Sequence, residues 1–176
     1  KTFNTKMYIN ALWNNNIFDR RFWLLGMCVC LYYAIYLSFI TISSSFLQNK
    51  YNYSFNYANS IQPIPYIIGA IFTPVFGYII DRIGKRCQCL LISVILYIIA
   101  HLILGFTDEN SFKFTIIIGI TSLGFGYAIS TAILWPCFGI LYSKEYLPTC
   151  FGFWGSIDNG FKATAFLIVG WLNDND

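Results

Sequence analysis

Gly77-Tyr-Ile-Ile-Asp81-Arg82-Ile-Gly84-Lys85-Arg86 is the stretch of this sequence that decides its fold. It stands where one long apolar run ends, and the next apolar run begins directly after it. A glycine lets the chain reverse direction because it lacks a Cβ atom. Basic side chains are typical of short loops on the cytoplasmic face of a membrane. The stretch therefore predicts a tight, charged turn between two membrane helices.

Composition sets the class of protein independently of this turn. The chain is 57% hydrophobic and 11% charged, whereas soluble domains carry about 25% charged residues. So much apolar surface cannot be buried inside a globule of 176 residues, and a lipid bilayer is the expected partner. The net charge is only +3 and the basic residues lie in loops rather than in one patch, so no nucleic-acid partner is expected.

The apolar runs predict membrane crossings. About 20 apolar residues span the hydrocarbon core, and five segments reach this length. Backbone polar groups in lipid must be satisfied within their own segment, so each crossing is expected to be a helix. The sequence thus predicts an all-α integral membrane protein. Its expected parts are a polar approach segment at residues 1–21 and a half-bundle at 22–176 with helices at 22–47, 61–80, 89–106, 114–142 and 149–172.

The basic residues predict the orientation of these helices. One side has only Lys50 and Lys113, so the other side is expected to be cytoplasmic. The loop at 48–60 then faces the lumen or exterior, where Asn52-Tyr53-Ser54 is an N-glycosylation sequon. An unused triplet is an equal alternative in a chain so rich in Asn. The basic side holds Lys1, Lys6, Arg20, Arg21, Arg82, Lys85, Arg86 and Lys144.

Residues for metal binding and covalent chemistry do not form a recognisable set. The six cysteines include no Cys-x-x-Cys pair, and the single His101 completes no tetrahedral metal site. No glycine-rich loop for phosphates is found either. We therefore expect no cofactor and no enzymatic activity. His101 is expected to be a hydrogen-bonded structural histidine, with a proton relay as the less favoured alternative.

The spacing G-x-x-x-D-R-x-G-K-R resembles the signature loop of major facilitator superfamily transporters, which joins the second and third helices of each six-helix half. Similarity to the branch that contains the lysosomal dipeptide uniporters extends from about Phe22 to Asp174. The segments that carry it are Leu123-Gly-Phe-Gly-Tyr127, Ala132-Ile-Leu-Trp135-Pro136, Gly152-Phe-Trp-Gly-Ser156-Ile157-Asp158-Asn159 and Ile168-Val-Gly-Trp-Leu172-Asn-Asp174.

The resemblance implies five helices that correspond to helices seven to eleven of a twelve-helix transporter. The chain begins with Lys and stops soon after its last apolar run, so we expect a fragment. The missing N-terminal six-helix half is then an expected partner, in the same longer chain or as a separate one. The resemblance favours a lysosomal or vacuolar membrane, with the mitochondrial inner membrane or the plasma membrane as alternatives.

The resemblance also assigns roles in gating to the signature loop. Asp81 would meet a helix N-terminus of the other half when the cytoplasmic gate is closed, because the helix dipole favours an anion there. Arg82 would hold Asp81 or a neighbouring carbonyl. The expected gating residues are Gly77, Asp81, Arg82, Gly84, Lys85 and Arg86.

Six residues are expected to contact solute: Tyr32, Tyr36, Trp135, Asp158, Asn159 and Lys162. By family analogy the first and fourth helices line the cavity, although the tyrosines can simply pack. Asp158 and Lys162 stand at i and i+4 and are expected to form an ion pair, opposite the small residues Gly152 and Ser156. Asp158 replaces an amide of the branch pattern, and Lys162 replaces an apolar residue. The pair is either a gate or contact to a zwitterionic solute, or a docking contact to a neighbouring helix or protein.

These observations favour transport of a small organic solute by alternating access, with a short peptide or amino acid favoured by the resemblance. The transport would be facilitated or proton-coupled. The alternative is a non-transporting accessory subunit of a large membrane complex, derived from a transporter half. A receptor or sensor on the same fold has weaker support.

Overall fold

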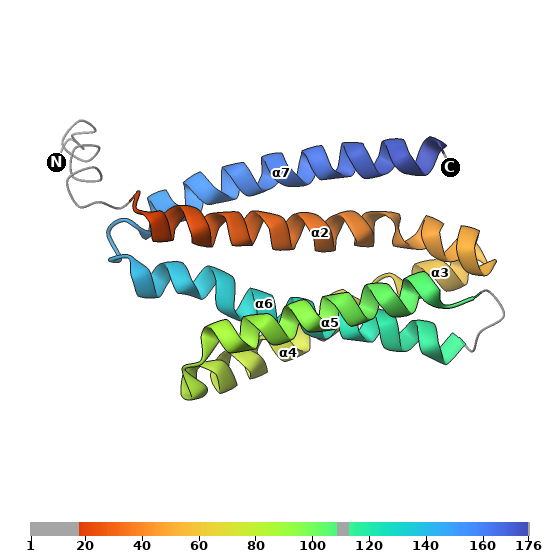
Figure 1. Cartoon of the computed structure of the whole chain (residues 1–176), viewed down its shortest axis with the longest axis horizontal. Helices are drawn as coiled ribbons and strands as arrows, with labels where there is room; N and C mark the ends of the chain where they lie inside the picture. The colour runs from red at the N-terminus through yellow and green to blue at the C-terminus, as the bar shows by residue number, and fades with distance from the viewer. Residues whose placement is uncertain (1–17, 109–112, 176) are drawn as a thin grey trace.

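The computed structural model describes residues 18–108 and 113–175, and these residues form helices and no strand. Most of the predicted approach segment at 1–21 lies outside the described residues. The prediction of an all-α fold is confirmed. The helices in chain order are α2 (Arg20–Tyr51), α3 (Phe55–Ile61), α4 (Ile64–Ile83), α5 (Arg86–Phe106), α6 (Lys113–Leu141) and α7 (Leu147–Asn175) (Figure 1).

Local chemistry explains where the second predicted crossing differs. The predicted crossing at 61–80 corresponds to α4, which begins at Ile64 because Pro63 has no N–H to continue α3 across the junction. Helix α2 continues to Tyr51, and α3 occupies part of the stretch for which the sequence predicted a loop at 48–60. The side chain of Ser54 accepts the N–H of Tyr57 and so caps α3.

The helices form two groups. Helix α6 lies between α4 and α5 and packs closely on both, whereas α4 and α5 contact each other little although they are consecutive. A Cβ atom added at Gly124 of α6 would lie 3.0 Å from the Cα atom of Pro65, which shows how close α4 approaches. Helices α2 and α7 form a parallel pair on one side of α6 (Figure 1).

Among the described residues, four helical segments are long and apolar enough to cross a membrane: Arg20–Tyr51, Phe55–Ile83, Arg86–Phe106 and Lys113–Leu141. Helix α7 is not among them because Asp158 and Lys162 lower its apolar content. It nevertheless has 29 residues and runs beside α2 (Figure 1). Its charged pair lies on the side of the helix that is buried against the bundle. The fifth crossing, for which α7 is the matching helix, stays a prediction.

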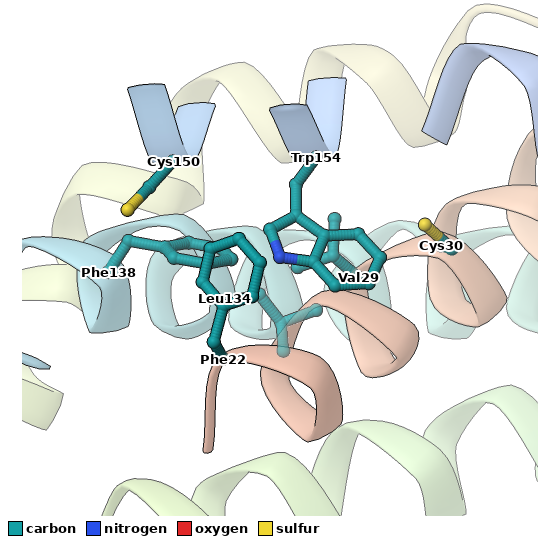
Figure 2. Packing of buried hydrophobic residues seen from close by; sticks show 7 residues of the cluster. All are labelled: Phe22, Val29, Cys30, Leu134, Phe138, Cys150 and Trp154. Atoms are coloured by element: carbon teal, nitrogen blue, oxygen red, sulfur yellow. The ribbon is translucent and has the colours of Figure 1, made fainter. Parts of the chain in front are cut away.

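A compact apolar cluster joins the start of α2, the end of α6 and the start of α7. Figure 2 shows its buried residues, Phe22, Val29, Cys30, Leu134, Phe138, Cys150 and Trp154. Trp154 of α7 is 1% exposed and covers Gly26 of α2. A Cβ atom at Gly26 would lie 1.8 Å from Trp154 Cε2, so only glycine permits this contact. The contact fixes the axial register of α7 on α2.

Candidate functional site

A polar cluster lies where α2, α6 and α7 meet, and we call it the junction cluster: Tyr33, Trp135, Asp158, Asn159 and Lys162. The Lys162 Nζ atom is 2.5 Å from Asp158 Oδ2. It also donates to Asn159 Oδ1 at 3.4 Å and lies 5.4 Å from the centre of the Tyr33 ring. The ammonium therefore faces a carboxylate, an amide oxygen and an aromatic face.

The register of α7 on α2 places this cluster. Asp158 follows Trp154 by one helical turn and shares its buried face, so the tryptophan that packs on Gly26 also directs Asp158 inward. Lys162 follows by a further turn. Ser156 lies on the exposed face of α7, where its hydroxyl donates to the Gly152 carbonyl of its own helix at 2.8 Å.

Helix α6 holds the aromatic side of the junction cluster in place. Trp135 Nε1 donates to the Tyr33 hydroxyl at 3.0 Å, and that hydroxyl is 3.2 Å from Thr131 Oγ1. Both ends of the tyrosine are thus engaged, the hydroxyl by α6 and the ring by Lys162. The ring is fixed independently of the cation above it.

One polar atom of the cluster has no partner among the described residues. Asp158 is 3% exposed, and its Oδ1 atom is buried without a hydrogen-bond donor. Buried polar atoms in folded proteins are nearly always satisfied, because an unpaired one costs desolvation free energy. This oxygen therefore has an unused capacity to accept a hydrogen bond from a donor group that reaches it.

The structure brings four of the six predicted solute contacts together, namely Trp135, Asp158, Asn159 and Lys162. The other two point elsewhere. The Tyr32 hydroxyl donates to the Leu90 carbonyl of α5 at 3.1 Å.

Tyr36 is fully buried in a group of tyrosines from different helices. Its ring stacks on Tyr127 with 4.2 Å between ring centres, and the edges of Tyr66 and Tyr97 face it. Tyr32 and Tyr36 thus have interhelical contacts that do not include the junction cluster.

Tyr33 is the member of the cluster that the sequence prediction omitted. It differs from Tyr32 by about 100° around the helix axis, and this rotation aims it at α6 and α7 instead of α5. No pattern within α2 distinguishes the two tyrosines. The i, i+1, i+4 spacing of Tyr32, Tyr33 and Tyr36 is the only sequence signal that the helix contacts several neighbours.

The signature loop has the tight geometry that the sequence predicted, with a different ion pair. Gly84 ends α4 with φ +70°, and its N–H donates to the Ile80 carbonyl at 2.9 Å. The carboxylate of Asp81 pairs with Arg86 instead of Arg82. The Arg82 guanidinium lies 4.6 Å above the ring of Tyr78. Arg86 follows Asp81 by five positions, so the pair closes across the turn.

The start of α2 is joined to the end of α6 on the same side. Asp19 Oδ1 accepts the N–H of Phe22 at 2.8 Å and the hydroxyl of Tyr142 at 2.9 Å. The backbone hydrogen bond from Phe22 holds the pKa of the Asp19 carboxyl below its ordinary value of 3.8. The carboxylate thus serves both as a helix cap and as an interhelical contact.

His101 has the hydrogen-bonded environment that the sequence favoured. Its Nδ1 atom is 2.8 Å from the Tyr97 carbonyl of the preceding turn. Its ring packs edge to face with Phe39, with 5.2 Å between the ring centres. Within the described part of the chain, no group of three or more His, Cys, Asp or Glu side chains is positioned to hold a metal ion.

Comparison with known proteins places these features in a family context. The sequence profile of the Major Facilitator Superfamily matches residues 22–175. No solved structure matches the chain.

Curated relatives are named lysosomal dipeptide transporter MFSD1. The chicken protein (Gallus gallus) is 33% identical over 158 residues, which cover 89% of this chain and 34% of the relative. The mouse protein (Mus musculus) is 32% identical over 149 residues, 85% of this chain and 31% of the relative. The human protein (Homo sapiens) is 31% identical over 159 residues, which cover 90% of this chain and 33% of the relative. The chain thus spans about a third of the length of these relatives.

Proposed function

The chain belongs to the major facilitator superfamily, and on that premise we propose that the protein containing it transports a small organic solute across a membrane by alternating access. The observation that carries the proposal is the junction cluster. Charged side chains within membrane helices are costly and usually belong to a solute or ion pathway. Here Asp158 and Lys162 lie at mid-length in α7, next to hydrogen-bonding groups of α2 and α6.

The relatives favour a short peptide or amino acid as the solute, because their names describe lysosomal dipeptide transporters. A zwitterion is also consistent with a site that contains one acid and one base. The same names favour a lysosomal or vacuolar membrane. A complete six-helix N-terminal half would supply the opposite wall of the pathway.

The signature loop is the proposed cytoplasmic gate. The Asp81 side chain is 65% exposed although it pairs with Arg86, so one side of the carboxylate is open to a second partner. A helix N-terminus of the other half is such a partner, because its dipole and free N–H groups favour an anion. Loss of the Asp81 charge would weaken the closed gate and change the conformational balance.

Uptake into proteoliposomes tests the proposal. The full-length protein is reconstituted, and uptake of radiolabelled alanyl-alanine and of single amino acids is measured with and without a proton gradient. Saturable uptake supports transport, and dependence on the gradient identifies proton coupling. Absence of uptake, combined with stoichiometric co-purification of other membrane proteins, contradicts transport and supports the accessory-subunit alternative.

A variant tests the gate separately. Asp81→Asn is expected to slow turnover without loss of expression, whereas Lys144→Gln serves as the matched control because it removes a charge on the same side outside the loop. Uptake by Asp81→Asn at the wild-type rate, with equal amounts of protein in the membrane, would show that this carboxylate does not control the gate.

A further inference from the structure

We propose that Asp158, Asn159 and the ring of Tyr33 form a binding site for a primary ammonium group, and that the Lys162 ammonium occupies it when no solute is bound. The amino group of a short peptide or amino acid replaces Lys162 there. The displaced lysine then pairs with the carboxylate of the same solute. This inference rests on the proposed function and specifies how its solute is recognised.

The contacts of Lys162 support the ammonium site. A carboxylate oxygen at 2.5 Å, an amide oxygen at 3.4 Å and an aromatic face at 5.4 Å surround its Nζ atom. Carboxylates, carbonyl-type oxygens and aromatic faces are the groups that bind ammonium ions in proteins. None of these contacts depends on the carbon stem of the lysine. A solute with a free amino group presents the same chemistry.

The second carboxylate oxygen of Asp158 gives the incoming group an unused acceptor. Lys162 pairs with Oδ2, whereas Oδ1 is buried and has no donor among the described residues. Because Oδ1 is buried, a second ammonium reaches it as the lysine moves away from Oδ2. The carboxylate is thus never without a cation during the exchange. An unpaired charge in the membrane interior would otherwise oppose it.

The Tyr33 ring is held in place, whereas the Lys162 side chain can move. This difference favours replacement of the Lys162 ammonium by the solute over binding of both cations together. The Tyr33 hydroxyl is held by Trp135 and Thr131, so the ring stays in place when the cation changes. Lys162 has a flexible four-carbon stem, and its side chain is 19% exposed. It can turn toward solvent and reach a carboxylate without movement of α7.

Charge balance identifies a zwitterion as the preferred class of solute. Asp158 and Lys162 together carry no net charge before binding. A zwitterion whose ammonium binds Asp158 and whose carboxylate binds Lys162 leaves that sum unchanged. A simple amine would instead leave Lys162 without a counter-ion, and a solute with a blocked amino group could not displace it.

End-blocked dipeptides test this assignment in the full-length transporter. Inhibition of labelled alanyl-alanine uptake is measured with unlabelled alanyl-alanine, N-acetyl-alanyl-alanine, alanyl-alanine amide and n-butylammonium. For the wild type, each of the last three is expected to inhibit at least about tenfold more weakly than the unmodified dipeptide. Equal inhibition by the acetylated and unmodified dipeptides in the wild type would overturn the ammonium site.

Removal of the Lys162 ammonium gives an inhibition pattern that only the proposed ammonium site predicts. In Lys162→Met the ammonium site is empty, so n-butylammonium is expected to become an inhibitor, and the preference for a free carboxylate over the amide is lost. Ser156→Ala is the matched control, since it removes a polar group from the exposed face of the same helix. It is expected to keep the wild-type inhibition pattern.

A second variant tests the proposal in case Lys162→Met fails to fold. Lys162→Met leaves Asp158 unpaired, so the double variant Asp158→Asn with Lys162→Met is prepared as an uncharged pair and its thermal stability is checked in detergent. It is expected to fold and to lose the distinction between free and acetylated amino groups. Retention of that distinction, or no inhibition by n-butylammonium in a folded Lys162→Met, would overturn the proposal even if dipeptide uptake continues. Absence of any peptide or amino-acid uptake by the wild type would instead refute the proposed function.

Discussion

Gly26→Ala is expected to separate α7 from α2. The added Cβ atom would lie 1.8 Å from Trp154 Cε2, 2.0 Å from Cδ2 and 2.1 Å from Cζ2. Carbon atoms pack at about 3.5–4.0 Å, so the indole has to move by about 1.7 Å or more. The clash is with the face of a rigid ring and not with the end of a flexible chain.

The aromatic rings around Trp154 prevent its side chain from moving away at low energetic cost. The indole is 1% exposed, and its ring centre lies 5.5 Å from that of Phe22, 5.7 Å from that of Trp23 and 5.6 Å from that of Phe153. Rotation of the side chain would therefore displace other aromatic rings. Overpacking of a well-packed core costs about 1–3 kcal/mol, and we expect the upper end, about 3 kcal/mol.

Thermal unfolding of the full-length protein in detergent measures this loss of stability. Gly155→Ala is the control, because it lies in α7 next to Trp154 yet a Cβ atom there meets nothing within 4 Å. Gly26→Ala is expected to lower Tm by several degrees, whereas Gly155→Ala is expected to have little effect. Since Asp158 depends on the same register, Gly26→Ala should also reduce uptake.

A double-mutant cycle decides whether the indole is the cause. Trp154→Leu removes the ring that the new methyl group meets, so Gly26→Ala is expected to cost much less in that background. The coupling free energy should be about 2 kcal/mol. Wild-type Tm for Gly26→Ala, or the same loss in both backgrounds, would refute the explanation.

Three further outcomes follow from the described geometry. Gly84→Ala should lower stability by about 1–2 kcal/mol, because a residue with a Cβ atom is strained at φ +70°; Gly77→Ala, which has open space, is the control for the Tm comparison. The Asp19 cap should be fully effective above pH 3.8 and lost as the pH falls through the lowered folded pKa, so Asp19→Asn should show a weaker dependence of Tm on pH below about 4. Tyr33→Phe leaves the Trp135 N–H without its acceptor and should cost about 1–2 kcal/mol by thermal unfolding, whereas an unchanged Tm would mean that water replaces the hydroxyl.

Features encoded within one segment were predictable from the sequence. Four of the five predicted crossings correspond to helices that are long and apolar enough to cross a membrane, and Gly84 with its basic neighbours predicts the turn between α4 and α5. The Asp158–Lys162 pair follows from an i, i+4 spacing on one helix. Each of these depends only on residues that are close along the chain.

Features set by the packing of one helix on another were not predictable. Tyr33 belongs to the junction cluster because Gly26 and Trp154 fix the register of α7 on α2, and that register is not encoded in either helix alone. The choice of Arg86 over Arg82 as the partner of Asp81 likewise depends on how the turn directs the next helix.

The spacing of contacts along α2 has an evolutionary consequence. Gly26 accommodates an indole of α7, Tyr32 reaches α5, and Tyr33 reaches both α6 and Lys162. Insertion of one residue between Gly26 and Tyr33 would turn everything beyond it by about 100° and advance it by about 1.5 Å. Gly26 could then keep its contact with Trp154 only if the tyrosines beyond the insertion lost their partners, and no single compensating substitution restores both sets of contacts. The number of residues between Gly26 and Tyr33 is therefore fixed by the packing of α2. We expect related sequences to differ there in residue type but to have no insertions or deletions.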